Sequence, residues 1–468
     1  MTDNPIHIPE DLKTVIRVFK KNSKQCWLVG GALRDAFLGR ETDDFDLATD
    51  ALPEEVVKMF HRTFPTGMRH GTVSILLGTH QFETTTLRRD GRYSDGRRPD
   101  EVSYSQNILE DLARRDFTIN AIAWDLINHR LLDPHNGRED LKKHLIRAIG
   151  TPSERFHEDA LRAIRACRFA SQLNFQIHQT TMNAIDAALS WVPSLSAERI
   201  WEELKKILCS PQPSIAFNLF NESGLLAILL PELEACVGIR QKNSDARDVF
   251  QHMLSVCDMA DSGNFAVRAA ALLHDIAAPL FQGVDADEEV SIHQHAARGA
   301  DISDGILRKY RASNAVRERI TRLVRQHKFS YSSEWTDATI RRFMARAGLD
   351  IVDDLLALRR ADVLANADWL PDDAENQLAE LEDRIRGILA AQGVFTVGDL
   401  ALDGYSLMNE LQLKPGPLIG RLLRHLLDCA LDNPKHNEKA RLLELSRSWL
   451  ETRESTHPKT EFSDRRIS

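Results

Sequence analysis

Two aspartates separated by a single residue, Asp44 and Asp46, form the pattern with the clearest chemical meaning in this sequence. On an extended strand, residues two apart point to the same face, so both carboxylates would share one site. Carboxylates this close repel each other, and both stay ionised when a divalent cation lies between them. The spacing therefore predicts a Mg²⁺ site, although a solvent-exposed acidic edge would show the same pattern.

A glycine pair precedes these acids. Gly30 and Gly31 follow an apolar run, and Arg34 comes three residues after the second glycine. Glycines at the start of a helix let backbone N–H groups approach phosphate oxygens, and an arginine can donate two hydrogen bonds to the same anion. The segment predicts a phosphate-binding turn next to the metal site, whereas the glycine pair alone would indicate only a tight turn.

The elements that must position these residues are short. Residues 26–29, 45–48 and 73–77 are apolar runs bounded by glycine, proline or aspartate, which is typical of strands. Residues 53–64 have the pattern of an amphipathic helix. The first part of the chain is therefore predicted to be α/β.

From about residue 156 the pattern changes to long segments with helical periodicity, for example residues 159–171, 196–208 and 315–326. The rest of the chain is predicted to be almost wholly helical. Breaks near Pro231 and near residues 387–398 divide it. The predicted domains are therefore residues 1–150, 151–235, 236–386 and 387–468, with a disordered polar end to the last one.

Composition limits the class of protein. A chain of 468 residues with 43% hydrophobic residues can form several cores, and its net charge of -9 restricts nucleic-acid contacts to local basic patches. The six cysteines are far apart, which argues against a disulfide framework or a cysteine zinc site. We expect a cytoplasmic protein without a membrane segment; its oligomeric state stays open.

The pattern Gly30-Gly31-x-x-Arg34-Asp35, followed by Asp44-x-Asp46, resembles the signature of the class II tRNA nucleotidyltransferases. These are the CCA-adding enzymes and their relatives, the bacterial poly(A) polymerases. The resemblance implies an α+β protein: an α/β nucleotidyltransferase head with a mixed sheet like that of DNA polymerase beta, then an elongated all-helical body. It also implies Mg²⁺ on Asp44 and Asp46, ATP and CTP as substrates, and the tRNA 3′ end as partner.

The same resemblance suggests the remaining residues of the active site. Glu83 is the candidate third catalytic acid, since the superfamily takes one from a neighbouring strand; a strand glutamate facing water is the alternative. Residues 114–120 resemble the ribose-recognising motif, so Arg115, Asp116 and Asn120 are expected to bind the nucleotide. As a bare sequence, this segment would suit a surface ion-pair cluster.

Residues 157–168 resemble the family's amino-acid template for base selection. Asp159 and Arg162 would bind the Watson–Crick edge of the incoming base, because a carboxylate accepts from the exocyclic amine that cytosine and adenine share. Arg165 and Arg168 would neutralise the triphosphate or the RNA end. The spacing of three residues predicts one helical row, which in isolation could equally be a solvent-exposed salt-bridge ladder.

Residues 90–99 are rich in glycine and charge, and resemble the family's flexible loop. Their presence favours addition of CCA or of the terminal A over addition of CC alone.

The strongest basic run lies between Ile306 and Ser330, with eight Lys or Arg residues against one acid, Glu318. Phosphate contacts supply most non-specific affinity for nucleic acid, so this run is a candidate surface for RNA. A solvent-exposed helix face, neutralised by the acidic residues 350–383, is the alternative.

His252, His274, Asp275 and Asp362, with His295 and His327 between them, resemble an HD phosphohydrolase domain. Imidazole and carboxylate are ligands for a transition metal, so these four residues form a second candidate metal site. The match departs from the usual pattern at residues 276–279, and an alanine follows His295 where a glutamate is usual. These departures weigh against hydrolytic activity and leave metal binding open.

Three functions remain open from the sequence. The favoured one is template-independent addition of CCA, or of a terminal A, to tRNA. The second is a poly(A) polymerase acting on RNA 3′ ends, which would usually carry a strongly basic C-terminal extension. The third is an HD-type phosphohydrolase or RNA-binding protein with an inert head.

Overall fold

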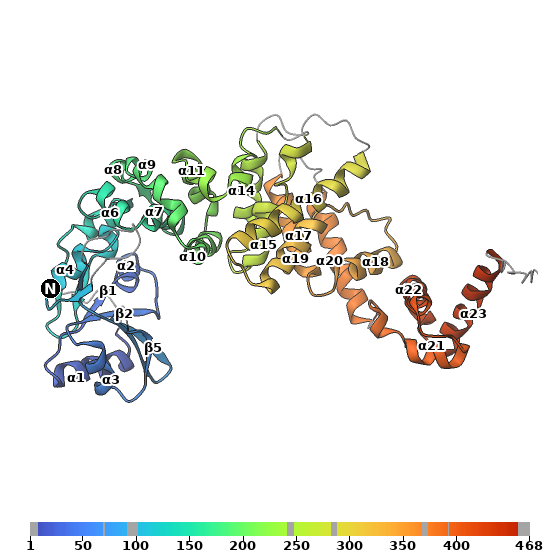
Figure 1. Cartoon of the computed structure of the whole chain (residues 1–468), viewed down its shortest axis with the longest axis horizontal. Helices are drawn as coiled ribbons and strands as arrows, with labels where there is room; N and C mark the ends of the chain where they lie inside the picture. The colour runs from blue at the N-terminus through green and yellow to red at the C-terminus, as the bar shows by residue number, and fades with distance from the viewer. Residues whose placement is uncertain are drawn as a thin grey trace, which may run out of the picture.

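The computed structural model describes residues 8–68, 71–90, 102–240, 248–281, 288–366, 373–391 and 393–456. Figure 1 shows an elongated molecule with a sheet-containing head at one end, a helical body next to it, and the C-terminal helices at the far end. The predicted α+β fold, a mixed-sheet head followed by an elongated helical body, is therefore confirmed. Within the described ranges, no helix combines the length and the apolar character that crossing a membrane requires.

The head contains a sheet of seven strands, counted over the described residues, in the order β3-β4-β5-β2-β1-β8-β9. β2 and β5 pair in parallel and the other neighbours pair antiparallel, so the sheet is mixed. Its strands are β1 (Trp27–Val29), β2 (Phe45–Thr49), β3 (Thr63–Gly67), β4 (Thr72–Leu77), β5 (His80–Thr86), β8 (Ala123–Asp125) and β9 (Arg130–Leu132). Two smaller pairs are β6 (Arg88–Asp90) with β7 (Val102–Tyr104), and β10 (Leu145–Ile146) with β11 (Gln176–Ile177).

Side chains along the central strands alternate between the two faces of the sheet, and each face packs into a separate core. Leu28 and Leu47 join the main core together with α1, whereas Trp27 and Ala48 join a smaller core together with α4. The helices of the head are α1 (Glu10–Lys21), α2 (Gly31–Phe37), α3 (Pro53–Met59), α4 (Ile108–Ala113), the 3₁₀ turn η2 (Thr118–Asn120) and α5 (Gly137–Lys142). Since alternate residues point to opposite faces, Asp46 shares the face of Ala48.

The three predicted strands are present as β1, β2 and β4, but the helix predicted for residues 53–64 was too long. α3 ends at Met59, and β3 begins at Thr63. Phe60 already has extended dihedrals, and Phe64 precedes Pro65, which disfavours helical backbone.

The body and tail are helical. Next to the head lie α6 (Pro152–Glu158), α7 (Leu161–Leu173), α8 (Gln179–Asn183), α9 (Ile185–Ala188), η3 (Leu189–Ser194), α10 (Ala197–Leu208), α11 (Pro213–Glu222), α12 (Leu225–Leu229) and α13 (Pro231–Glu234). The central part contains α14 (Val249–Met259), α15 (Phe265–Leu273), η4 (Ala278–Phe281), α16 (Glu288–Lys309), α17 (Asn314–Gln326), α18 (Asp337–Ala347), α19 (Val352–Ala365) and α20 (Ala374–Ala390). The tail contains η5 (Val397–Asp399), α21 (Gly404–Leu411), α22 (Pro417–Asp432), η6 (Pro434–His436) and α23 (Lys439–Thr456), around a small core of its own. The predicted domain boundaries stay predictions.

The predicted helices at residues 196–208 and 315–326 are confirmed as α10 and α17. The helix predicted for residues 159–171 begins only at Leu161, and Asp159 lies in the break between α6 and α7. Asp159 has extended backbone dihedrals, and its Oδ1 accepts a hydrogen bond from the Leu161 N–H at 3.1 Å. Aspartate competes for such local bonds, which explains why it ends one helix and precedes the next.

Candidate active site

The two acids predicted to bind metal lie at the beginning of β2. Asp46 is on the strand and partly buried, whereas Asp44 is exposed and immediately precedes it. Burial, with the negative charges of Asp44 and Glu83, raises the pKa of Asp46 to about 6, against the opposing effect of Arg115 and Arg34. A carboxyl group held at such a pKa gains from a cation that neutralises the cluster.

Glu83 lies beside these acids. β2 and β5 run parallel, and Asp46 and Glu83 are register partners, so their side chains leave the same face of the sheet. Glu83 is exposed to solvent. The structure therefore brings all three predicted catalytic acids close together in the head.

The glycine turn contacts the same carboxylate. Gly30 has φ +73°, a conformation that side chains rarely adopt, and it connects β1 to α2. A Cβ on Gly30 would lie 3.0 Å from Asp46 Oδ2 and 3.5 Å from the nearer Arg115 nitrogen. Gly31 is the first residue of α2. The turn therefore leaves no room for a side chain between the backbone and the acids.

Arg34, the predicted phosphate ligand, is held by protein acceptors. It donates two hydrogen bonds of 2.9 Å to the Asp35 carboxylate and one of 3.0 Å to Asn120 Oδ1. A phosphate contact would require Arg34 to exchange or share these partners. Its role in binding the triphosphate stays a prediction.

Arg115 is oriented by an acid that sequence reasoning missed. Buried Asp111, on α4, accepts hydrogen bonds from both Arg114 and Arg115. Arg115 also donates to the Asn120 carbonyl at 3.3 Å. The spacing of three and four residues between Asp111 and the arginine pair was the available signal.

Asp116 and Asn120 connect the head to α7. Asp116 accepts from the Phe117 N–H, from Asn120 Nδ2, and from two nitrogens of Arg165 at 2.9 and 2.7 Å. Burial opposes its ionisation, but Arg165 and these hydrogen bonds outweigh that effect and lower the pKa of Asp116 to about 2. The predicted ribose-binding residues are therefore part of a charged network that extends to the helix of the predicted base template.

The two residues predicted to select the base differ in exposure and in partners. Asp159 accepts a 2.7 Å hydrogen bond from Arg199 of α10, which sequence reasoning did not identify. Arg162 is buried and donates to Glu158 at 2.6 Å, to the Arg155 carbonyl and to the Arg114 carbonyl. These contacts fix the orientation of the Arg162 guanidinium.

Arg168, predicted to neutralise the triphosphate, is buried. It donates to Glu203 of α10 at 2.5 Å and to Gln172, and its guanidinium lies 3.9 Å from the centre of the Phe169 ring. Arg165 contacts both Asp116 and Glu203. These arginines therefore tie α7 to α10 and to the head; a direct contact of Arg168 with a substrate stays a prediction.

The loop predicted for residues 90–99 falls almost entirely outside the described residues, which include only Asp90, the last residue of β6. What it implies about A addition stays a prediction.

The basic run between Ile306 and Ser330 is largely neutralised within the described part of the chain. Arg319 and Arg322 pair with Asp354 and Asp350, which belong to the acidic stretch considered as the alternative. The remaining pairs are Arg308–Asp304, Arg311–Glu198, Arg317–Asp304, Arg325–Asp301 and Lys328–Asp275. The alternative of a salt-bridged surface therefore explains this run better than a dedicated RNA surface.

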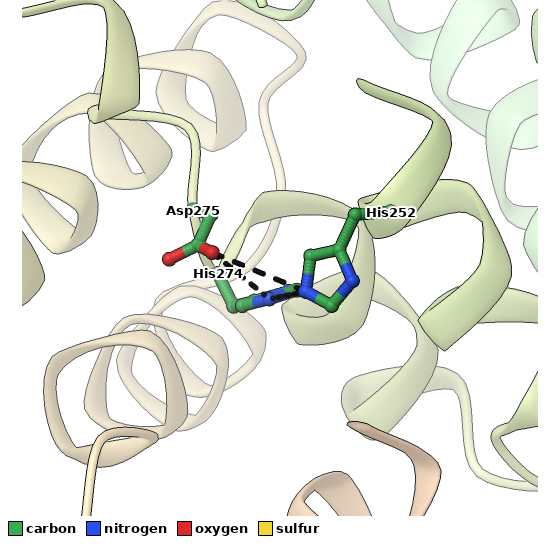
Figure 2. Close-up of side chains that lie close together, drawn as sticks. All are labelled: His252, His274 and Asp275. Carbon is green, nitrogen blue, oxygen red and sulfur yellow. Dashed lines mark hydrogen bonds and ion pairs between the residues drawn. The ribbon is translucent and has the colours of Figure 1, made fainter. Parts of the chain in front are cut away.

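The histidine cluster is assembled from several helices of the body. His252 of α14 and His274, directly after α15, lie with their Nε2 atoms 3.1 Å apart, and Asp275 Oδ2 is 3.5 Å from His274 Nε2. Figure 2 shows these three side chains converging. Their ligand atoms lie within 4.8 Å of one another, and all three residues are buried. Asp362 Oδ1 is 3.5 Å from His252 Nε2, outside that compact group but next to it.

Three segments of the chain match family models. Residues 26–147 match the poly A polymerase head domain, residues 174–237 match an RNA and SrmB-binding site of polymerase A, and residues 299–445 match the tRNA nucleotidyltransferase domain 2. The first segment contains the acids and the glycine turn.

One of two curated relatives extends the similarity over nearly the whole chain. A CCA-adding enzyme of Geobacillus kaustophilus is 32% identical over 95% of this chain and 97% of that relative. A CCA-adding enzyme of Lactobacillus helveticus is 46% identical, but the match spans only 45% of this chain and 53% of that relative. The match to the first relative therefore spans nearly the full length of the chain, and the match to the second spans about half.

Among solved structures, the crystal structure of the Bacillus stearothermophilus CCA-adding enzyme in complex with CTP superposes with a TM-score of 0.75. The match has 27% sequence identity and covers 97% of this chain and 100% of that one. The likeness therefore includes the head, the helical body and the tail.

Proposed function

The chain belongs to the CCA-adding enzyme family of tRNA nucleotidyltransferases, and we propose that it adds C, C and A to the 3′ end of tRNA. CTP and ATP are the substrates, and no nucleic-acid template is used. The observation that carries the proposal is the convergence of Asp44, Asp46 and Glu83 beside the Gly30 turn. A head with these acids in place has the groups that nucleotidyl transfer requires.

The acids give the head its proposed chemistry. Asp44 and Asp46 would hold Mg²⁺, which lowers the pKa of the RNA 3′-hydroxyl and offsets the charge of the triphosphate. Glu83 would complete the negative cluster from the neighbouring strand. The Gly30 turn keeps the backbone close to Asp46, so the backbone N–H groups of the turn can approach phosphates that the cation would hold.

Base selection is assigned to the junction of α6 and α7. Asp159 can accept from the exocyclic amine of cytosine or adenine, and Arg162 can donate to a ring nitrogen or carbonyl. Arg199 and Glu158, which hold these two side chains, set the direction in which each presents its polar atoms. Guanine and uracil would leave buried polar groups unpaired and are rejected for that reason.

Incubation with three tRNAs tests this function directly. Substrates ending before CCA, before CA and before A are each supplied with labelled CTP and ATP, and the products are resolved at single-nucleotide length. The proposal expects extension to the same CCA end from all three, with no further growth. Long A tails would show a poly(A) polymerase instead, and extension of the third tRNA alone would show terminal A addition.

The histidine cluster in the body favours a second candidate function, which is the binding of a metal ion. We propose that His252, His274, Asp275 and Asp362 hold one divalent transition metal. His274 Nδ1 lies 2.7 Å from the Ala271 carbonyl, which can only accept, so the proton is on Nδ1 and the Nε2 lone pair faces the cluster. This donor set suits a transition metal better than Mg²⁺, which prefers oxygen ligands.

The proposed substrate, tRNA, indicates the cellular compartment in which the enzyme works. We expect the enzyme to work in the cytoplasm, where thiols stay reduced. The six cysteines are all unpaired in the structure, in agreement with that expectation.

A further inference from the structure

Asp275 stands between two groups of ligands rather than at the edge of one. Its Oδ2 faces His274 at 3.5 Å and His252 at 4.0 Å. Its Oδ1 faces the opposite group, His295 at 3.7 Å and His327 at 3.5 Å. A carboxylate with imidazoles on both oxygens has the arrangement of a group that bridges two cations.

The second group adds two imidazoles on the other side of Asp275. His295 comes from α16 and His327 directly follows α17, and both are buried. His327 Nδ1 lies 2.6 Å from the Val324 carbonyl, so the proton is on Nδ1. His327 Nε2 is buried without a hydrogen-bond partner in the structure and faces Asp275 Oδ1. A lone pair directed at a carboxylate oxygen is unfavourable unless a cation lies near both atoms.

A lysine places an ammonium group at this carboxylate oxygen and at His295. Lys328 Nζ lies 3.2 Å from Asp275 Oδ1 and 3.3 Å from His295 Nδ1. Its ammonium group therefore contacts two of the three donors that a metal ion in the second group would use. An ammonium and a divalent ion repel each other strongly at such distances, so the two cannot share the second group.

We propose that Lys328 occupies the second cation position of this cluster, so that the body binds one transition metal on the His252 side of Asp275 and none on the His295 side. Removing the lysine charge opens the second position, in which Asp275 Oδ1, His295 and His327 become ligands. This inference rests on the proposed metal centre in the body. It is independent of the nucleotidyltransferase activity of the head.

The test is the metal stoichiometry of the full-length chain. All proteins carry Asp44→Asn and Asp46→Asn, so that the head contributes no tight site. Metal-free protein is titrated with Co²⁺, and bound metal is measured by mass spectrometry and by the visible absorption of the Co²⁺ ion. Lys328→Met keeps the length of the side chain and removes its charge; because the Lys328 side chain is 34% exposed, folding should tolerate the change.

The matched control is Arg325→Met, near the end of α17 and three residues before Lys328. Arg325 is exposed and pairs with Asp301, at a distance from the cluster, so its loss removes a cation without changing the ligands. Thermal melting of all variants confirms that each is folded. We expect one Co²⁺ per chain in the parent, which keeps Lys328, and in Arg325→Met. We expect two Co²⁺ per chain in Lys328→Met, with a second set of absorption bands.

Each other result has a definite meaning. Two ions in the Lys328 parent would overturn the role of the lysine, because the metal would then displace it. One ion in both the parent and Lys328→Met would overturn the second position but keep the first. No tight Co²⁺ in any variant would overturn the metal centre itself, without any consequence for transfer by the head.

Discussion

Asp46 on β2 and Glu83 on β5 are register partners of two parallel strands, and Asp46 also lies beside the position that a Cβ of Gly30 would take. This single relationship places two carboxylates and the Gly30 turn within one small region. It also explains why the pKa of Asp46 is raised, since burial acts together with two negative neighbours. Activity and stability should therefore respond in opposite directions when the charge is removed.

Asp46→Asn should abolish nucleotide addition, by about 10³-fold or more, because the cation would lose a ligand in the transition state. Asp44→Asn should do the same. The measurement is single-turnover extension of tRNA at saturating Mg²⁺, with circular dichroism to show that the fold is retained. Activity near that of the parent in either variant would remove these acids from the catalytic assignment.

Asp46→Asn should also stabilise the metal-free protein at neutral and alkaline pH. The raised pKa of about 6 means that the folded state holds a proton which the unfolded state releases from about pH 4 upward. The free energy of unfolding of the metal-free parent therefore falls as the pH rises from about 4 to about 6. Above about pH 6 the folded state bears the full destabilisation by the Asp46 charge. After allowance for partial exposure, we expect a gain of about 1–2 kcal/mol in the variant at pH 8 and none near pH 4.

Urea unfolding in the presence of a chelator measures this gain, and the parent with Mg²⁺ is the control. Bound Mg²⁺ should stabilise the parent but not Asp46→Asn, so the difference in unfolding free energy between the two proteins should become smaller. An equal effect of Asp46→Asn at pH 4 and pH 8 would mean that the raised pKa is not its cause.

Glu83→Gln should lower transfer less severely than loss of either aspartate, by about 10- to 100-fold. Glutamine keeps the shape but removes the charge that Glu83 adds from β5, so cation binding should weaken as well. The Mg²⁺ concentration that gives half of the maximal rate should therefore be higher in the variant than in the parent. A matched control is Glu54→Gln, which should change neither the rate nor its Mg²⁺ dependence: exposed Glu54 is on α3, which packs through Val56 on the face of the sheet opposite to Asp46.

Arg162→Lys should change the choice between CTP and ATP rather than weaken both equally. The arginine makes contacts with Glu158 and with two backbone carbonyls, and a lysine cannot reproduce their planar arrangement. The measurement is kcat/KM for each nucleotide on the matching tRNA. An equal loss for CTP and ATP, with an unchanged ratio, would show that Arg162 supports the helix junction without reading the base.

Much of this arrangement could be predicted from sequence because its signals are local. The strand-glycine-helix pattern around Gly30 and the two-residue spacing of Asp44 and Asp46 depend on neighbouring residues only. Glu83 was the harder case: it lies far along the chain, and only the parallel pairing of β2 with β5 places it beside Asp46. The sequence contains no local signal for that pairing.

The partners of Asp159, predicted to select the base, and of Arg168, predicted to neutralise the triphosphate or the RNA end, could not be predicted for the same reason. Arg199 and Glu203 come from α10, and their pairing with Asp159 and Arg168 depends on how α10 packs against α7. The break at Asp159 was missed because a continuous helical period runs through it, although an aspartate can cap a helix start. The neighbours of Asp275 could not be predicted from local sequence either, because His274 and His327 contact its two oxygens only in the folded body.

Arg268→Met should destabilise the body where the helices next to the head meet the central part. Arg268 of α15 is 3% exposed and donates to the carbonyls of Ala260 and Leu208, each at 2.9 Å, and to that of Ser210. Methionine fills similar volume but leaves three buried acceptors unpaired, which should cost about 3 kcal/mol. The urea midpoint followed by circular dichroism should fall accordingly, and Arg268→Lys should recover part of it. Exposed Arg386→Met, which loses only a surface pair with Asp383, should stay within about 0.5 kcal/mol of the parent. If the two methionine variants unfolded at the same urea concentration, the three hydrogen bonds of Arg268 would not be what holds α15 to the end of α10.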